Sequence, residues 1–265
     1  MRTRTWFGGV AIAGVLLVAA KWMAAALAQP APIAEVAPAA PITTSPVAPP
    51  TVQRPAAHGP AAVDPGPATI TVEDVQFAQA DPSANGTAAL VASLDAADRI
   101  VASEAADGLV ARGAVTAIPA LRAIDVGARP DIAPGIIDAL GRLGAMADGE
   151  LRTDAVTRLL ELLDAEKHRR APESAGNLVM IYEALGQTRD VRAAPRLEVE
   201  LADQTLGKAP KVVVVQALAA IGAPSSHAAI ERLREQLVGT TEVDAYQAEL
   251  RRDLLAVIDA ALAAP

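Results

Sequence analysis

Aliphatic residues recur at helical spacing from about residue 94 to the end of the chain. Four segments share a pattern around a central leucine, 31, 45 and 33 residues apart: Leu109, Leu140, Leu185 and Leu218. In three of them one aliphatic residue follows twelve positions later and another three or four after that: Leu121 and Ile124, Leu197 and Leu201, Ile230 and Leu233. Such spacing marks one buried helix face. Its repetition predicts stacked helical hairpins, because a single hairpin cannot bury its apolar face alone.

Glycine and proline divide each hairpin into two helices. Gly113, Gly144 and Gly222 follow the central leucine by four residues, where a left-handed helix end favours glycine. Pro119 and Pro195 then fall in the first turn of the second helix, where a missing amide costs little.

The second segment departs from this register. We expect an insertion at about residues 145–152, followed by a second helix through Val156, Leu159, Leu160 and Leu163.

The repeats are flanked by two segments of different pattern. Residues 68–92 form a transitional segment, whose stretch Thr69–Phe77 has the pattern of extended structure. We expect it to dock on the first helix as a cap, with burial of Phe77, and the alternative is a free binding motif. Residues 241–265 repeat apolar positions at helical spacing and predict a capping helix with a polar outer surface. The repeat domain is therefore expected at residues 93–265.

The residues Ala-Leu-Gly-Gln-Thr-Arg-Asp-Val-Arg-Ala-Ala-Pro-Arg-Leu at 184–197 resemble the short HEAT-like repeat first described in phycobilin lyases. Ala139–Gly144 and Ala217–Gly222 match its core. The resemblance covers about residues 95–240 and implies an all-α, right-handed α-solenoid of about four hairpins plus the C-terminal capping helix. It implies interaction scaffolds more than any one activity, and nothing in these residues adds a pigment site.

The first 28 residues have the pattern of a signal peptide. Arg2 and Arg4 precede an uncharged apolar run over residues 6–20, and Ala26-Leu-Ala28 supplies small residues before a cleavage site between Ala28 and Gln29. The alternative is a retained membrane anchor, although fifteen apolar residues are few for a span that needs about 20. We expect an exported protein, periplasmic or secreted, with anchoring in the inner membrane by residues 1–28 as the alternative.

Residues 29–67 predict a disordered linker rich in proline and alanine. Eleven of these 39 residues are proline, which removes amide donors and blocks helices. Such a segment favours extended polyproline II and acts as a semi-rigid spacer.

Composition and charge exclude several classes of partner and site. There is no cysteine, so disulfides, thiolate metal sites and cysteine nucleophiles are excluded. Residues 68–265 carry 19 basic and 29 acidic side chains, which is a poor match for a phosphate backbone. We therefore expect no nucleic-acid partner, and contact with a membrane only if residues 1–28 are retained.

No residue pattern predicts catalysis or a cofactor. Ser225 and Ser226 precede His227, but they are better placed to cap a helix than to act as nucleophiles, and no orienting carboxylate is evident. No phosphate loop and no metal-ligand spacing occurs, so we expect no cofactor and no metal.

We therefore expect a non-catalytic scaffold that binds a protein or peptide. The second helices would present a concave face, and on the helical wheel its candidate binding residues are Arg122, Arg158, Glu161, Glu198 and Arg234. Two alternatives stay open: an anchored envelope strut with a proline-rich spacer, and a small-molecule binder or lyase-like enzyme.

Overall fold

The computed structural model describes residues 69–169, 171, 174–242 and 244–263. The signal peptide with its Ala28–Gln29 cleavage site and the proline-rich linker lie outside these residues and stay predictions. Every regular element described is helical, which confirms the all-α fold. The α-helices are α2 (Val72–Ala80), α3 (Ala84–Ser93), α4 (Arg99–Ala111), α5 (Ile118–Ala123), α6 (Ala133–Met146), α7 (Gly149–Arg169), α8 (Ser174–Thr188), α9 (Ala194–Ala202), α10 (Lys208–Ile221), α11 (Pro224–Val238) and α12 (Ala245–Ala263).

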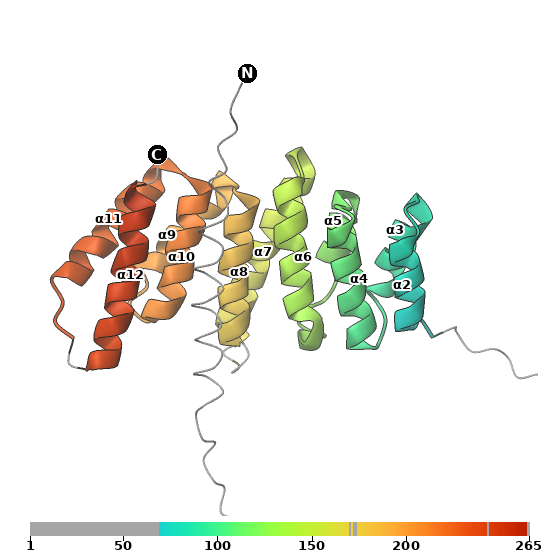
Figure 1. The fold of residues 1–265 in the computed structure, drawn as a ribbon, viewed down its shortest axis with the longest axis horizontal. Coiled ribbons are helices and arrows are strands. Elements are labelled where there is room, and N and C mark those ends of the chain that lie inside the picture. The colour runs from blue at the N-terminus through green and yellow to red at the C-terminus, as the bar shows by residue number, and fades with distance from the viewer. Residues whose placement is uncertain (1–68, 170, 172–173, 243, 264–265) are drawn as a thin grey trace, which may run out of the picture. The chain divides into compact units, whose positions relative to one another are not determined.

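The helices form two layers that follow the chain order from α2 to α12 (Figure 1). In the first layer α2, α4, α6, α8, α10 and α12 each pack on the next. The second layer holds α5, α7, α9 and α11, and three-residue 3-10 turns precede α5, α6 and α9: Val115–Ala117, Pro130–Ile132 and Val191–Ala193. The four predicted hairpins are therefore α4–α5, α6–α7, α8–α9 and α10–α11, with α12 as the terminal helix.

The Ala-Leu-Gly motif of the first helices has a direct packing role. The four central leucines are fully buried: Leu109, Leu140, Leu185 and Leu218. Gly141 lies so close to α8 that a Cβ there would be 2.7 Å from the Cβ of Ala184. Gly186 repeats the contact one helix later, where a Cβ would be 2.7 Å from the Cα of Ala217. The leucine thus fills the core, while glycine and alanine let neighbouring first helices touch.

Residues 68–92 differ from the prediction, because they add a fifth hairpin, α2–α3, at the N-terminal end of the stack. The hydroxyl of Thr71 accepts the N–H of Asp74, and the Asp74 carboxylate accepts the N–H of Thr71, which starts a helix rather than a strand. Val75 and Ala78 face the core, and Phe77 lies on the other side, with 68% of its surface exposed. The predicted docking of Phe77 is therefore wrong.

The second repeat contains no inserted loop at residues 145–152. Helix α6 continues to Met146, α7 begins at Gly149, and the extra residues lengthen α7 to 21 residues. Gly144 is accordingly not a helix end: it is buried inside α6, where a Cβ would be 3.0 Å from Thr188 Cγ2. The extra residues predicted in the second repeat therefore extend α7.

The other helix-end predictions are confirmed. Gly113 and Gly222 have φ angles of 62° and 67°. Pro119 and Pro195 lie in the first turns of α5 and α9. Arg189 takes the same left-handed backbone in the third repeat, with φ of 52°, at the position that Gly113 and Gly222 occupy in theirs.

This gives a first testable prediction. Replacing Arg189 with glycine should raise the free energy of unfolding by about 1 kcal/mol, because a side chain with a Cβ pays a steric cost in this region that glycine avoids. Chemical denaturation of the full chain measures it, with Gly222→Ala as the opposite control, expected to lose stability. A loss of stability in the Arg189→Gly variant would contradict this prediction. It would show that contacts of the Arg189 side chain stabilise the fold by more than the left-handed backbone destabilises it.

Candidate functional site: the surface of the second helices

The residues predicted to bind a partner all lie on second helices, but the structure divides them among three separate clusters. Arg122 on α5 pairs with Asp154 and, at 3.7 Å, with Glu161 on α7. Arg158 pairs with the same Glu161 at 3.1 Å and donates a hydrogen bond to the carbonyl of Ile124 at 2.8 Å. These side chains tie α7 to α5 and the turn after it.

Glu198 and Arg234 each belong to a different contact. The Glu198 carboxylate on α9 accepts hydrogen bonds from the hydroxyls of Ser225 at 2.8 Å and Ser226 at 3.2 Å, in the first turn of α11. The two serines therefore do not cap α11, whose N-cap is Ala223 without a side-chain hydrogen bond. Arg234 on α11 pairs with Asp259 on α12 at 2.6 Å. The five predicted residues thus brace neighbouring helices and do not converge on one site.

The third repeat contains a buried polar network that the sequence analysis missed. Glu200 on α9 is fully buried, and its carboxylate accepts a hydrogen bond from the hydroxyl of buried Tyr182 on α8 at 2.9 Å. Lys167 at the end of α7 donates to both Glu200 oxygens, at 2.8 and 3.1 Å. Arg196 pairs with Glu200 at 3.1 Å, and Asp203 pairs with Lys167 at 3.3 Å. One buried carboxylate therefore joins α7, α8 and α9.

The network perturbs the pKa values of its members. Burial and the adjacent Glu200 carboxylate raise the pKa of the Tyr182 hydroxyl, which stays protonated as a donor. Burial alone would lower the pKa of Lys167, but Glu200 and Asp203 outweigh it and raise that pKa. Hydrogen bonds from the Thr205 hydroxyl and backbone, with Lys167 adding to them, lower the pKa of Asp203 to about 2.

The depressed pKa of Asp203 predicts a specific acid sensitivity. A carboxylate with a lower pKa in the folded state stabilises the fold fully above its ordinary value of 3.8, and this contribution is lost as the pH falls from there towards 2. In the full chain the Asp203→Asn variant should therefore lose less stability than the wild type over that window. Urea unfolding at pH 5, 4, 3 and 2 measures the difference, and parallel curves for both proteins would contradict it.

A register comparison could have located Glu200. It follows Leu197 by three residues, as Ile124 follows Leu121 and Leu233 follows Ile230. Ile124 and Leu233 are buried aliphatic residues, so Glu200 is a carboxylate at a core position. The repeat pattern allowed the next aliphatic residue three or four positions after Leu197, and buried Leu201 satisfied it. Glu200 was therefore not compared with the aliphatic residues at the same position of the other repeats.

Four basic side chains, on α7, on α9 and in the 3-10 turn before α9, pair with carboxylates that are themselves buried. Arg192 pairs with Asp190 at 2.5 Å, and its side chain is 46% exposed against 8% for Asp190. Lys167 and Arg196 are about one-third exposed over fully buried Glu200. Arg169 repeats the arrangement over buried Glu166 at 3.4 Å. The positive member of each pair therefore faces the solvent.

An apolar stripe runs along the outer face of α9 and the turn before it. Val191, Pro195, Val199 and Ala202 follow one another at four, four and three residues, and all four are exposed. Val191 is 61% and Val199 58% exposed, although valine is normally a core residue. On either side of the stripe α9 is fixed to its neighbours, by Arg196 to Asp164 on α7 and by Glu198 to Ser225 on α11.

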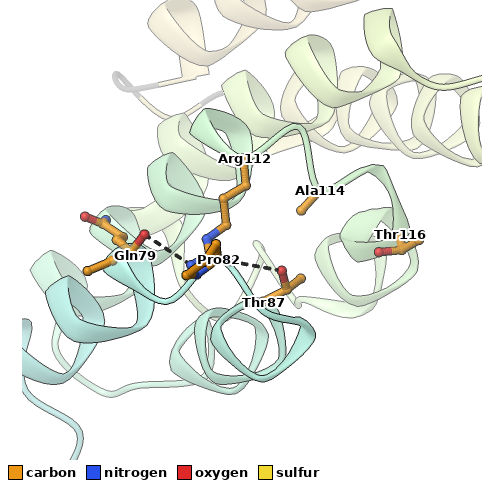
Figure 2. Close-up of a pocket in the computed structure, with 7 residues that line it drawn as sticks. Gln79, Pro82, Thr87, Arg112, Ala114 and Thr116 are labelled. Carbon is orange, nitrogen blue, oxygen red and sulfur yellow. Dashed lines mark hydrogen bonds between the residues drawn. The ribbon is translucent and has the colours of Figure 1, made fainter.

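The surface hollows offer little for catalysis. One, of about 380 Å³, is lined by Gln79, Pro82, Thr87, Arg112 and Thr116 (Figure 2). Its only charged group, the Arg112 guanidinium, donates hydrogen bonds to the carbonyls of Ala78, Gln79 and Asp81 at the end of α2. A second hollow of about 440 Å³ lies at Arg234 and Asp259, between α11 and α12. Arg112 thus caps a helix, and Arg234 is held by its ion pair.

Two further properties concern metals and membranes. Within the described part of the chain, no three His, Cys, Asp or Glu side chains lie close enough together to bind a metal ion. None of the described helices combines the length and the apolar character needed to cross a membrane.

No family model matches the sequence, and no curated protein matches it. Among solved structures it is similar to the crystal structure of an engineered protein from a structural genomics consortium, with 18% sequence identity and a TM-score of 0.44. That similarity covers 71% of this chain and 88% of the engineered one.

Proposed function

We propose that the repeat domain is a non-catalytic scaffold that binds another protein through its second helices. The observation that carries the proposal is the exposed apolar stripe of Val191, Pro195, Val199 and Ala202 on α9. Contiguous exposed apolar side chains on a soluble protein favour a binding surface. The ion pair that fixes α9 to α7 and the hydrogen bond that fixes it to α11 support the same role, because a rigid surface loses less conformational entropy on binding.

The repeat architecture favours a protein partner over a small molecule. Stacked hairpins offer an extended surface, whereas small ligands need a concave pocket with converging polar groups. The resemblance to HEAT-like repeats points the same way, since such repeats act chiefly as interaction scaffolds.

We also propose that the protein acts outside the cytoplasm. The charged start, the apolar run and the Ala26-Leu-Ala28 end of the first segment support export. If residues 1–28 are retained, the proline-rich residues 29–67 would hold the scaffold away from a membrane, as in an envelope strut. The mass of the mature chain distinguishes the two forms.

Substitution at the centre of the stripe tests the scaffold proposal. Val199→Asp in the full chain should reduce recovery of the partner from the source cells at least tenfold, since a buried carboxylate at an interface is costly. Val238→Asp is the matched control, because Val238 at the end of α11 is equally exposed, at 63%, and lies outside the stripe. Quantitative mass spectrometry of cross-linked, affinity-purified complexes measures recovery. Equal partner recovery with both variants would contradict the role of the stripe.

A further inference from the structure

Lys211, the fourth residue of α10, places a charge where the other repeats have apolar side chains. It precedes the central leucine of its repeat by seven positions, and the same position holds Ala102, Ala133 and Leu178 in the other three repeats. Lys211 is only 7% exposed, and none of the described carboxylates or other acceptors pairs with its ammonium group. Because burial of an unpaired charge is costly, packing of the core alone gives no reason for a lysine here.

The charged groups that act on Lys211 are already paired with others. Asp203 forms an ion pair with Lys167 at 3.3 Å, and Lys208 forms one with Glu242 at 3.1 Å. Burial lowers the pKa of the Lys211 ammonium group, Asp203 counteracts this effect, and the like charge of Lys208 adds to it. The ammonium group of Lys211 therefore has no counter-ion of its own among the described residues.

The N-terminal end of α10 offers hydrogen-bond donors that the protein leaves free. Its N-cap, Gly207, makes no side-chain hydrogen bond, and its first turn holds no acidic residue. None of the described residues accepts a hydrogen bond from the amides of Lys208 and Ala209. Gly207 is exposed, and apart from its chain neighbours a Cβ there would meet only Pro210 Cδ within 4 Å, at 3.7 Å. The space in front of the two free amides is therefore open.

The side chain of Lys211 reaches towards the same end of the helix. Helical side chains lean towards the N-terminus, so the side chain of a fourth residue lies over the first turn. The charge of Lys211 accordingly acts on Lys208, at the start of α10, and on Asp203 in the loop before it. The N-terminus of a helix carries a partial positive charge, which disfavours two lysines there and favours an anion.

We infer that the N-terminal end of α10 binds a small oxyanion, phosphate or a carboxylate, between the amides of Lys208 and Ala209 and the ammonium group of Lys211. The anion supplies the counter-ion that Lys211 lacks and the acceptor that the two amides lack. Phosphate and carboxylate share this chemistry, since each presents charged oxygens to N–H donors. The site is separate from the α9 stripe and does not depend on the scaffold function.

Titration of the full chain with sodium phosphate and, separately, with sodium acetate tests this inference by amide NMR. The amide resonances of Lys208 and Ala209 should shift and saturate with one of the two ions, and the ion that binds more tightly identifies the preferred oxyanion. Sodium chloride at equal ionic strength should leave these resonances in place. The affinity should fall at least tenfold in Lys211→Met. It should stay unchanged in Arg232→Met, which removes an exposed positive charge on α11.

Thermal unfolding of the same proteins gives a second measurement. Lys211→Met removes a buried unpaired charge, so without the anion it should unfold at a temperature no lower than the wild type. A saturating concentration of the preferred ion should raise the midpoint of the wild type by more than that of Lys211→Met, because only the wild type binds it tightly. The comparison also removes the general stabilising effect of phosphate, which both proteins share.

Three results would overturn the inference. They are amide resonances of Lys208 and Ala209 that do not shift, shifts that increase without saturation with both ions, and an equal gain in thermal stability for the wild type and Lys211→Met. The wild-type titration remains decisive if the variant does not fold. None of these results bears on partner binding at α9, so the scaffold function is tested separately.

Discussion

Replacing Glu200 with alanine should lower the free energy of unfolding by about 3 kcal/mol. The change leaves the buried Tyr182 hydroxyl without its acceptor, which costs about 1–3 kcal/mol, and opens a cavity where the Glu200 side chain was. Lys167 and Arg196 lose their shared partner but keep Asp203 and Asp164. Chemical denaturation of the full chain, followed by circular dichroism, measures the loss.

A double substitution provides the control for this prediction. Tyr182→Phe with Glu200→Leu removes donor and acceptor together and fills the space with apolar atoms, so it should recover most of the stability lost in Glu200→Ala. It also removes the buried carboxylate that Lys167 and Arg196 share. A double variant as unstable as Glu200→Ala would show that Glu200 stabilises the fold mainly through Lys167 and Arg196.

Replacing Gly186 with alanine should destabilise the fold by about 2 kcal/mol. Alanine favours a helix over glycine by about 1 kcal/mol, but here its Cβ would be 2.7 Å from the Cα of Ala217 and 2.8 Å from its Cβ. Backbone atoms cannot rotate away, so α8 and α10 must separate, and overpacking of this kind costs about 1–3 kcal/mol beyond the helix preference. The thermal unfolding midpoint of the full chain measures the effect.

Gly176 is the matched control in the same helix. A Cβ at Gly176 would meet nothing within 4 Å, so Gly176→Ala should stabilise the fold by about 0.5 kcal/mol. Opposite signs at the two glycines would support the packing role of the Ala-Leu-Gly motif. The same sign at both would mean that the α8–α10 contact is looser than described.

The sequence predicted the helical hairpins because their signals are local and repeated. Leucine spacing, Pro119 and Pro195 in first turns, and Gly113 and Gly222 at helix ends each depend on a few neighbouring residues. Phe77 was misplaced because the stretch that contains the apolar residues Ile70, Val72, Val75 and Phe77 was interpreted as extended. The Thr71–Asp74 capping box that starts a helix there outweighs that pattern.

The candidate site was less accessible to sequence analysis, because its contacts between helices join residues at least 18 positions apart. Lys167 meets Glu200 only when the end of α7 lies beside α9. A helical wheel placed Glu198 and Arg234 on outward-facing positions. It could not show that Glu198 accepts a hydrogen bond from Ser225 or that Arg234 forms an ion pair with Asp259. Departure from the repeat pattern was the signal available at Glu200, and functional sites are where such departures are expected.

The most direct test of the proposed scaffold is site-specific cross-linking in the source cells. A photo-reactive amino acid placed at position 199 of the full chain should link one partner protein in high yield, and the same group at position 238 should not. A second substitution, Val191→Asp, should abolish the link at 199, because both residues belong to the stripe. Links of equal yield at both positions, or none at 199, would contradict the claim that α9 carries the binding surface.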